Sequence, residues 1–231
     1  MRMVSGVVAS LLVAGLLTGC SGSSEESGAS SSSAPAPSSA APTSRSTTKP
    51  PVPARPPAAD APVAAVIAWV QAGAPAELAG FHTATRDQDT TDLGEGVAFV
   101  TPSGKTQCRT DPSMTSGALA CLVKLAEPPA QPDEVAGQWI GNWVDFDGAA
   151  AQVGSVHGDP GPFTTGLGPE LAYGSSLRFG DFQCRTDQVG LFCVNFARQS
   201  ALRLSDAGVV PFGCLREVPA PADAGLRFEC R

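Results

Sequence analysis

The stretch Gln-Cys-Arg-Thr-Asp, QCRTD, occurs at Gln107–Asp111 and again at Gln183–Asp187. Each copy follows strand-like apolar residues and precedes a second strand-like stretch that carries its own cysteine, Cys121 in the first copy and Cys193 in the second. Both copies therefore predict a strand, a Cys-Arg-Thr-Asp turn and a second strand, with a disulfide across the hairpin. Neither copy supplies a base for a nucleophile, a second carboxylate or a glycine cradle, so we interpret the repeat as a duplicated structural unit.

The charged residues of the repeat stand two positions apart, on one side of an extended segment. We expect Arg109 to pair with Asp111, and Arg185 with Asp187, as exposed ion pairs at the rim of each hairpin. Exposed pairs of this kind contribute about 0–1 kcal/mol.

Six cysteines lie after residue 60: Cys108, Cys121, Cys184, Cys193, Cys214 and Cys230. An even number of cysteines in an exported chain indicates a disulfide framework, although six cysteines allow fifteen connectivities and sequence alone does not choose among them. Chain order favours the pairs Cys108–Cys121, Cys184–Cys193 and Cys214–Cys230, because each pair brackets a short loop flanked by strand-like residues. Zinc ligation is the rival interpretation, but it would need CxxC-type spacing with histidines nearby, and the chain has neither.

The part of the chain from Asp60 begins with a predicted helix. Asp60 is placed to cap it, Pro62 would lie in its first turn, and four apolar residues recur at helical spacing before Gly73: Val63, Val66, Ile67 and Val70. Strand-like segments follow: Gly96–Thr101, Ala118–Leu125, Gln138–Phe146, Ser176–Phe182, Gly190–Phe196, Ala201–Leu204 and Gly225–Cys230. We expect a mainly β fold: a small, disulfide-stapled antiparallel domain over residues 60–231 with one N-terminal helix. Residues 60–135 and 136–231 form either one core or two packed halves.

The N-terminal residues have the pattern of an exported lipoprotein. Arg2 precedes an apolar run, Val4–Leu17, that is too short to span a membrane comfortably but suits a signal peptide. Leu17-Thr18-Gly19-Cys20 resembles the lipobox of bacterial lipoproteins, in which Cys20 receives a lipid, such as a palmitate chain, and residues 1–19 are removed. Residues 20–59 are rich in Ser, Pro and Ala and predict a disordered tether. The sequence thus predicts a lipid-anchored protein on the outer face of the cell membrane.

The formal net charge of −7 argues against nucleic-acid binding, since no basic stripe is available to neutralise phosphates. The partners that we expect are the membrane, through the lipid anchor, and a cell-wall glycan or an envelope protein. No sequence pattern points to a cofactor or a metal.

Ser103–Thr106 imitates the end of a phosphate-binding loop but lacks its first glycine and following helix, so we interpret it as a turn. Asp87–Asp92 departs from calcium-loop spacing and reads as a solvated acidic loop.

Trp139 and Trp143 are the candidate ligand platform, because they would share one face of a strand with Gly141 between them. The alternative interpretation, that the indoles pack in the core, is the stronger one. We expect a non-catalytic binding module rather than an enzyme. The alternative function is a hydrolase of the wall or of exported substrates that uses His157 and a nearby carboxylate, although the chain lacks a G-x-S-x-G serine motif.

Three stretches of the chain carry a resemblance: "FVTPSGKTQC" (Phe99–Cys108), "LRFGDFQCRTDQVGLFCVNF" (Leu177–Phe196) and "PFGC" (Pro211–Cys214). With the lipobox and the Ser/Pro tether, they resemble secreted lipoproteins of mycobacteria and related actinobacteria that pair two cysteine hairpins. The resemblance covers roughly residues 93–231. It implies export, an envelope location and a disulfide-stapled β domain, and it implies no particular activity. Ala201–Leu204 departs from the pattern, which more often continues through glycine-rich residues.

Overall fold

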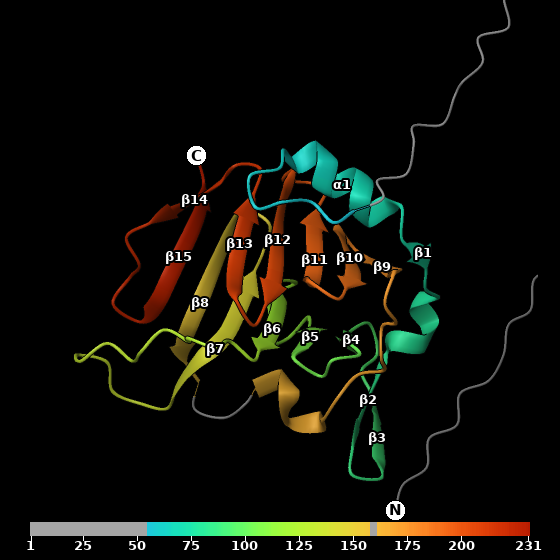
Figure 1. Ribbon diagram of the computed structural model, residues 1–231. Helices are drawn as coiled ribbons and strands as arrows, with labels where there is room; N and C mark the ends of the chain where they lie inside the picture. The colour runs from blue at the N-terminus through green and yellow to red at the C-terminus, as the bar shows by residue number, and fades with distance from the viewer. Residues whose placement is uncertain (1–54, 158–160) are drawn as a thin grey trace, which may run out of the picture. The chain divides into compact units, whose positions relative to one another are not determined.

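The computed structural model describes residues 55–157 and 161–231 (Figure 1). The predicted signal peptide, Cys20 and nearly all of the predicted tether lie outside the described residues. Within the described part of the chain, no helix is long and apolar enough to cross a membrane. The first elements are the helix α1 (Val63–Gln71), strand β1 (Ala74–Pro75), the 3₁₀ helix η1 (Leu78–Phe81), and strands β2 (Thr83–Arg86), β3 (Asp89–Asp92), β4 (Val97–Val100), β5 (Thr106–Thr110), β6 (Leu119–Val123), β7 (Trp139–Phe146) and β8 (Ala150–Val156). After them come the 3₁₀ helix η2 (Gly161–Thr165) and strands β9 (Ser175–Phe179), β10 (Phe182–Asp187), β11 (Gly190–Asn195), β12 (Ser200–Ser205), β13 (Gly208–Phe212), β14 (Leu215–Val218) and β15 (Ala224–Cys230).

The strands form two large sheets and a small hairpin (Figure 1). One sheet has the order β1-β9-β10-β11-β12-β13, the second has the order β14-β15-β8-β7-β6-β5-β4, and β2 pairs with β3 alone. Except for the short parallel pair of β1 and β9, every strand pair is antiparallel. The expected mainly β, antiparallel fold is confirmed.

Each sheet contains the same five-stranded meander, β4 to β8 in one and β9 to β13 in the other. The strand registers align the two copies residue by residue. In the first copy Cys108, Cys121, Val144 and Val153 stand side by side on successive strands, and the equivalent row in the second copy is Cys184, Cys193, Leu202 and Pro211. The duplication that QCRTD indicates therefore extends over five strands.

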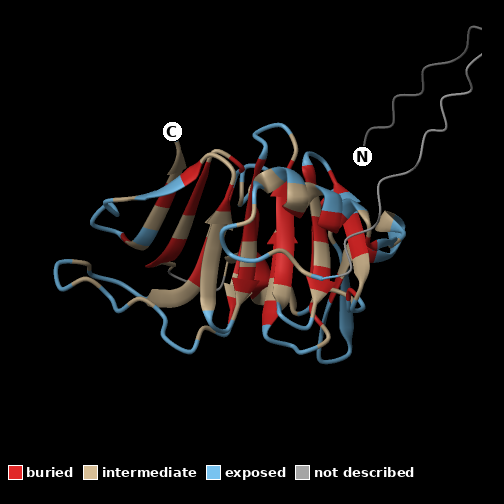
Figure 2. Cartoon of the chain, turned by 45° about the horizontal axis from the view of Figure 1, so that its top comes forward, coloured by how far each residue is buried: buried red, intermediate tan, exposed pale blue. Residues whose placement is uncertain are grey.

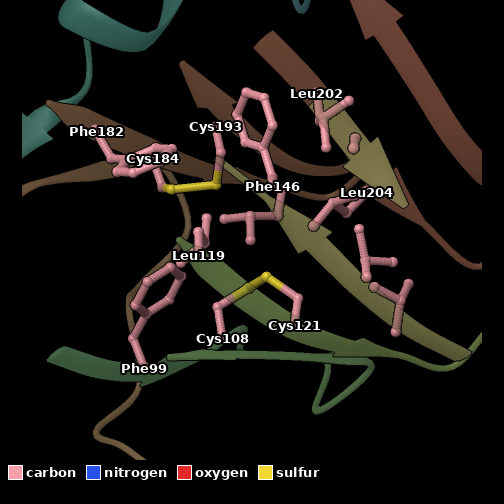
Figure 3. Close-up of a cluster of buried hydrophobic side chains, with 14 of the residues drawn as sticks. Phe99, Cys108, Leu119, Cys121, Phe146, Phe182, Cys184, Cys193, Leu202 and Leu204 are labelled. Atoms are coloured by element: carbon pink, nitrogen blue, oxygen red, sulfur yellow. A yellow bond between two sulfur atoms is a disulfide. The ribbon is translucent and has the colours of Figure 1, made fainter. Parts of the chain in front are cut away.

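The two sheets pack face to face around one hydrophobic core. Buried residues of both meanders, including all four repeat cysteines, belong to a single cluster. Figure 3 shows the bridges Cys108–Cys121 and Cys184–Cys193 on opposing sheets, with Phe146 beside them. Both bridges join directly opposite residues of neighbouring strands. Figure 2 shows this burial as red stripes that run along the central strands.

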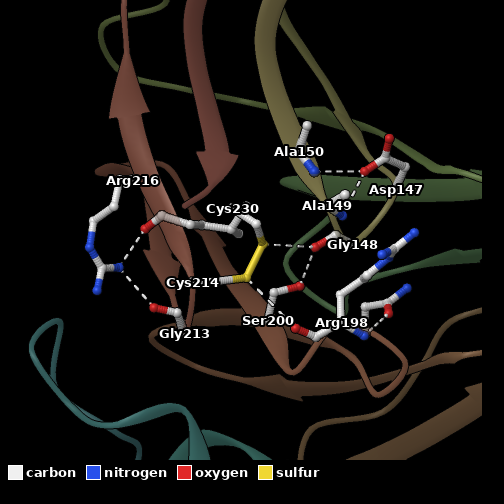
Figure 4. Close-up of a disulfide and its surroundings, with 12 residues drawn as sticks. Asp147, Gly148, Ala149, Ala150, Arg198, Ser200, Gly213, Cys214, Arg216 and Cys230 are labelled. Atoms are coloured by element: carbon white, nitrogen blue, oxygen red, sulfur yellow. Dashed lines mark hydrogen bonds between the residues drawn. A yellow bond between two sulfur atoms is a disulfide. The ribbon is translucent and has the colours of Figure 1, made fainter.

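The third disulfide, Cys214–Cys230, lies where the chain passes from β13 to β14 and so changes sheets (Figure 4). Nearby, the buried Ser200 hydroxyl donates to the carbonyl oxygen of Gly148 at 2.5 Å, which ties β12 of one sheet to the β7–β8 turn of the other. All three disulfide pairs that the sequence favours are thus present.

The structure corrects three details of the sequence analysis. QCRTD lies in strands β5 and β10, and the turns begin only at its aspartate. The N-cap residue of α1 is Pro62 and not Asp60, because Ala61 and Pro62 separate Asp60 from the first helical residue. No side chain forms a capping hydrogen bond at this end of the helix. A division at residues 135 and 136 would separate β6 from β7, which are hydrogen-bonded neighbours, so the two predicted halves share one core.

Candidate functional site

The outer face of each sheet is covered by a helical segment. On the second meander, α1 packs over a cluster of buried residues that comprises Val66, Trp69, Val70, Phe192, Val194, Ala201 and Phe212. On the first meander, the cover is η2, and the buried cluster is only Ala120, Trp143 and Phe163. The first meander therefore has the thinner apolar cover.

The arginine of each QCRTD copy holds the helical segment above its own sheet. Arg109, which is 3% exposed, donates from one guanidinium nitrogen to the carbonyl oxygen of Pro162 and, at 2.5 Å, to the hydroxyl of Thr165, both in η2. Arg185 donates to the carbonyl oxygen of Trp69 in α1 at 2.6 Å, and its guanidinium carbon lies 3.6 Å from the centre of that indole ring. Burial lowers the pKa of both guanidinium groups, and the nearby aspartates offset part of that effect.

The expected rim ion pairs within QCRTD are wrong. Within the part of the chain that the structure describes, the ion pairs are Lys105–Asp206 and Arg227–Glu229. Asp111 instead accepts hydrogen bonds from the backbone of Ser113 and Met114, and Asp187 accepts one from Val189. The two aspartates stabilise the turns that follow their strands.

A cavity of about 390 Å³ opens beside η2 on the outer face of the first meander. Its walls come from strand β7, from His157 directly after β8, from the β5–β6 turn and from η2. The lining residues are Met114, Thr115, Ser116, Ala118, Trp143, Asp145, His157, Gly161 and Pro162. This volume is within the range of small-molecule sites.

Trp143 and His157 form the aromatic wall of this pocket. Their ring centres are 3.6 Å apart in a stacked arrangement, and Phe163 packs edge-on against Trp143 with ring centres 5.2 Å apart. Trp143 is 2% exposed, and its indole nitrogen has no hydrogen-bond partner with normal geometry among the described residues.

Among the described residues, Asp145 is the one carboxylate that lines the pocket. It lies two residues along β7 from Trp143 and therefore on the same face. Burial raises the pKa of its carboxyl, and the nearby Trp143 indole N–H and His157 offset part of the rise. Burial likewise lowers the pKa of His157, and Asp145 offsets part of that effect. The imidazole is therefore neutral near pH 7.

The serine closest to this histidine is Ser155. Its hydroxyl oxygen, near the end of β8, lies 2.7 Å from Nε2 of His157, which directly follows that strand. Ser155 is 7% exposed and is not part of the pocket lining. Asp159, which the sequence places two residues after His157, lies outside the described residues.

The two tryptophans do not form the predicted platform. Trp139 donates its indole N–H to the carbonyl oxygen of Pro129 at 2.9 Å and packs against Gly154, whereas Trp143 packs against His157 and Phe163. A register shift between Ile140 and Val144 separates the two indoles, so strand alternation does not carry from one to the other. The alternative interpretation, that Trp143 is a packing residue, is confirmed by its burial.

Ser103–Thr106 contains the expected turn, whereas Asp89–Asp92, part of the expected acidic loop, forms the exposed strand β3. Ser103–Thr106 connects β4 to β5, where Gly104 adopts a positive φ of 63° and Lys105 pairs with Asp206 at 2.5 Å. Asp87, at a φ of 57°, lies in the turn of the exposed β2–β3 hairpin. Asp147 ends β7 and accepts the N–H groups of Ala149 and Ala150.

Seven of the nine residues that line the pocket were not among the predicted site residues, and Asp145 and Met114 are two of these. Asp145 could have been found from its spacing to Trp143, which places both on one strand face. No sequence pattern marks Met114 as a site residue, because it reaches the pocket only through the fold of its turn.

No family model, no curated protein and no solved structure matches this chain. The resemblance to actinobacterial secreted lipoproteins therefore stays a prediction.

Proposed function

We propose that this protein is a lipid-anchored lipoprotein of the cell envelope whose β domain is a non-catalytic binding module. The lipobox at Cys20, the tether and the three disulfides support export and anchoring on the outer face of the membrane. The ligand site is the pocket beside η2, and its ligand is part of a cell-wall glycan or of an envelope protein.

The observation that carries this proposal is the difference between the two copies of the meander. At equivalent positions, the first copy has Ala120, Trp143 and Asp145 where the second has Phe192, Ala201 and Arg203. In the second copy, these positions lie on the face that the nine-residue helix α1 covers with a large apolar cluster. In the first copy they lie beside a cavity whose lining includes Trp143 and the partly buried carboxylate of Asp145. The second face is thus filled by apolar packing, whereas the first leaves a cavity lined by a carboxylate, as is typical of ligand sites.

The test is a thermal-shift screen of the full chain against wall glycan fragments, envelope peptides and envelope lipids. A ligand at 100 times its dissociation constant stabilises a folded protein by about 2.7 kcal/mol, which raises the melting midpoint measurably. Ala118→Phe fills the pocket wall and is expected to abolish the shift. Ala207→Phe, at an exposed position of the β12–β13 turn, is the matched control and should leave it unchanged. A shift that persists in Ala118→Phe would place the ligand elsewhere.

Anchoring is tested separately. Cys20→Ser is expected to move the protein from the membrane fraction to the soluble fraction and to abolish incorporation of labelled palmitate. A serine variant that remains membrane-bound and labelled would contradict the lipid anchor.

The hydrolase remains the second candidate, because His157 lies within hydrogen-bond distance of the Ser155 hydroxyl and lines the same pocket as Asp145. A fluorophosphonate probe distinguishes the two functions, since it modifies an activated serine. We expect no labelling, because Ser155 is 7% exposed. Labelling that Ser155→Ala abolishes, and that Ser205→Ala does not, would make the hydrolase the better account.

A further inference from the structure

The Asp145 carboxylate has no positive partner in the folded domain. Across residues 55–157 and 161–231, neither of the two ion pairs includes it. Strand register brings Arg109 and Arg227 onto the same row of the outer face, on either side of Asp145. Both are committed elsewhere: Arg109 to η2, and Arg227 to Glu229 at 3.1 Å and Gln152 at 3.3 Å.

Among the described residues, the pocket lining carries one carboxylate and no fixed positive charge. Asp145 and His157 are its only ionisable lining residues among those described, and His157 is neutral near pH 7. Asp111 lies at the base of the turn that carries Met114, and hydrogen bonds from Ser113 and Met114 lower the pKa of its carboxyl. The chain as a whole carries a formal charge of −7 and so favours the approach of cations.

The uncharged walls suit a weakly hydrated cation. The stacked rings of Trp143 and His157 provide an aromatic surface, and the Met114 side chain, 62% exposed at the rim, provides a polarizable thioether. Pro162 closes the pocket from η2 without adding a charge.

We propose that the ligand held in this pocket carries an organic cationic group, an ammonium or a guanidinium, that pairs with Asp145. The inference rests on the proposed function, in which the pocket binds a ligand, and adds the chemical class of the group that enters it. The cation supplies the partner that Asp145 lacks, and the aromatic wall contacts the alkyl groups beside it.

The experiment is a two-dimensional ¹H–¹⁵N NMR titration of the full chain that follows the indole N–H signals. The chain has three tryptophans, so Trp69 and Trp139 serve as internal controls for Trp143, whose signal is assigned with Trp143→Phe. The probes are n-butylammonium, n-butylguanidinium, the neutral n-butanol and the anionic butyrate, at millimolar concentrations. A lysine-containing tripeptide and phosphatidylethanolamine vesicles then distinguish a peptide amine from a lipid headgroup as the source of the cation.

The cationic probes are expected to shift the Trp143 signal in a saturable way, while butanol and butyrate leave it in place. Asp145→Asn should weaken cation binding about tenfold or more, and Asp145→Glu should restore most of it. Glu217→Gln, which removes an exposed carboxylate from β14, is the matched control and should have no effect. Unchanged Trp69 and Trp139 signals in each variant show that the fold is kept.

Two results would overturn the cation proposal, and they have different consequences. If butanol or butyrate shifts Trp143 as strongly as the cations do, and Asp145→Asn has no effect, the pocket binds ligands by other chemistry and the proposed function stands. A second result would be that no probe moves the Trp143 signal, while an envelope fragment still raises the melting midpoint and Ala118→Phe abolishes that rise. The cationic class of the ligand would then be wrong, and the pocket would still be the binding site. If no probe moves Trp143 and no envelope fragment stabilises the protein, both proposals fail together.

Discussion

Arg109 and Arg185 occupy equivalent positions in the two meanders, and each donates to a backbone carbonyl of the helical segment that covers its own sheet. One arginine holds the 3₁₀ helix η2 and the other holds α1, two segments with no sequence in common. Both copies of the repeat therefore keep the arginine that attaches a helical segment to the sheet, although the two helical segments differ. What lies beneath the covers also differs: a packed apolar layer in the second copy and a pocket in the first.

Arg185→Ala is expected to destabilise the domain by about 2 kcal/mol, measured by urea unfolding. It removes a charge-assisted hydrogen bond, worth about 1.5–3 kcal/mol, and a cation–π contact with Trp69, worth about 0.5–1 kcal/mol or more, and partial rehydration offsets part of the loss. Arg178→Ala is the matched control, because its only described contact of this kind is with Phe196 at 4.4 Å on a more exposed surface. Equal losses in the two variants would mean that Arg185 does not hold α1.

Removal of the Cys184–Cys193 bridge by a double alanine substitution is expected to cost about 2–4 kcal/mol of unfolding free energy. The bridge is fully buried, joins directly opposed residues of β10 and β11, and belongs to the shared core. Peptide mapping without reduction checks the connectivity at the same time. A Cys108–Cys184 link would contradict both the connectivity and the two-copy arrangement.

Gly154→Ala is expected to destabilise the domain by about 1–3 kcal/mol, measured by thermal or urea unfolding. Gly154 has a positive φ of 75°, and a methyl group there would lie 2.6 Å from the Trp139 ring. Gly180→Ala shares the positive φ, at 48°, but meets no atom within 4 Å, so it measures the backbone cost alone. If both variants lose the same stability, Trp139 does not pack against this strand as described.

Asp145→Asn is expected to raise stability at pH 7, and the gain should disappear as the pH falls towards 3.8. The folded-state pKa of Asp145 lies above its ordinary value of 3.8, chiefly because burial disfavours the charge. The penalty is thus present above the folded pKa and absent below the unfolded one. Melting midpoints of the wild type and the variant across this range test the sign. A variant that is less stable at pH 7 would mean that the Asp145 charge is already compensated in the fold.

The sequence favoured the three disulfides that the structure contains, but it placed Cys108 and Cys184 in turns, and both lie in strands. Cys108, Cys121, Cys184 and Cys193 each lie in or beside a strong β pattern, so successive pairing and cross-strand bridges followed together. Strand β8, Ala150–Val156, was missed because its alanines and glycine have low β propensity. Strand β13 was missed because it contains Pro211, which is tolerated at a sheet edge.

The pocket could not be predicted from sequence for two physical reasons. Its cover, η2, has no helical periodicity over Gly161–Thr165, and it is held in place by Arg109, a residue far away in the chain. The stacking of His157 on Trp143 depends on the β7–β8 register, which shifts between Ile140 and Val144. The same shift separates Trp139 from Trp143, so the prediction from strand alternation that both indoles share one face was wrong.

The most direct test of the account is a ¹H–¹⁵N backbone NMR map of the full chain titrated with soluble cell-wall fragments and envelope peptides. We predict that the signals that move belong to the first meander and its cover: Met114–Ala118, Trp143, Asp145, His157 and Gly161. Signals of α1 and of Phe192 and Arg203, at the equivalent face of the second meander, should stay in place. Perturbations confined to the α1 face, or no perturbation by any fragment, would contradict the claim that the first meander carries the binding site.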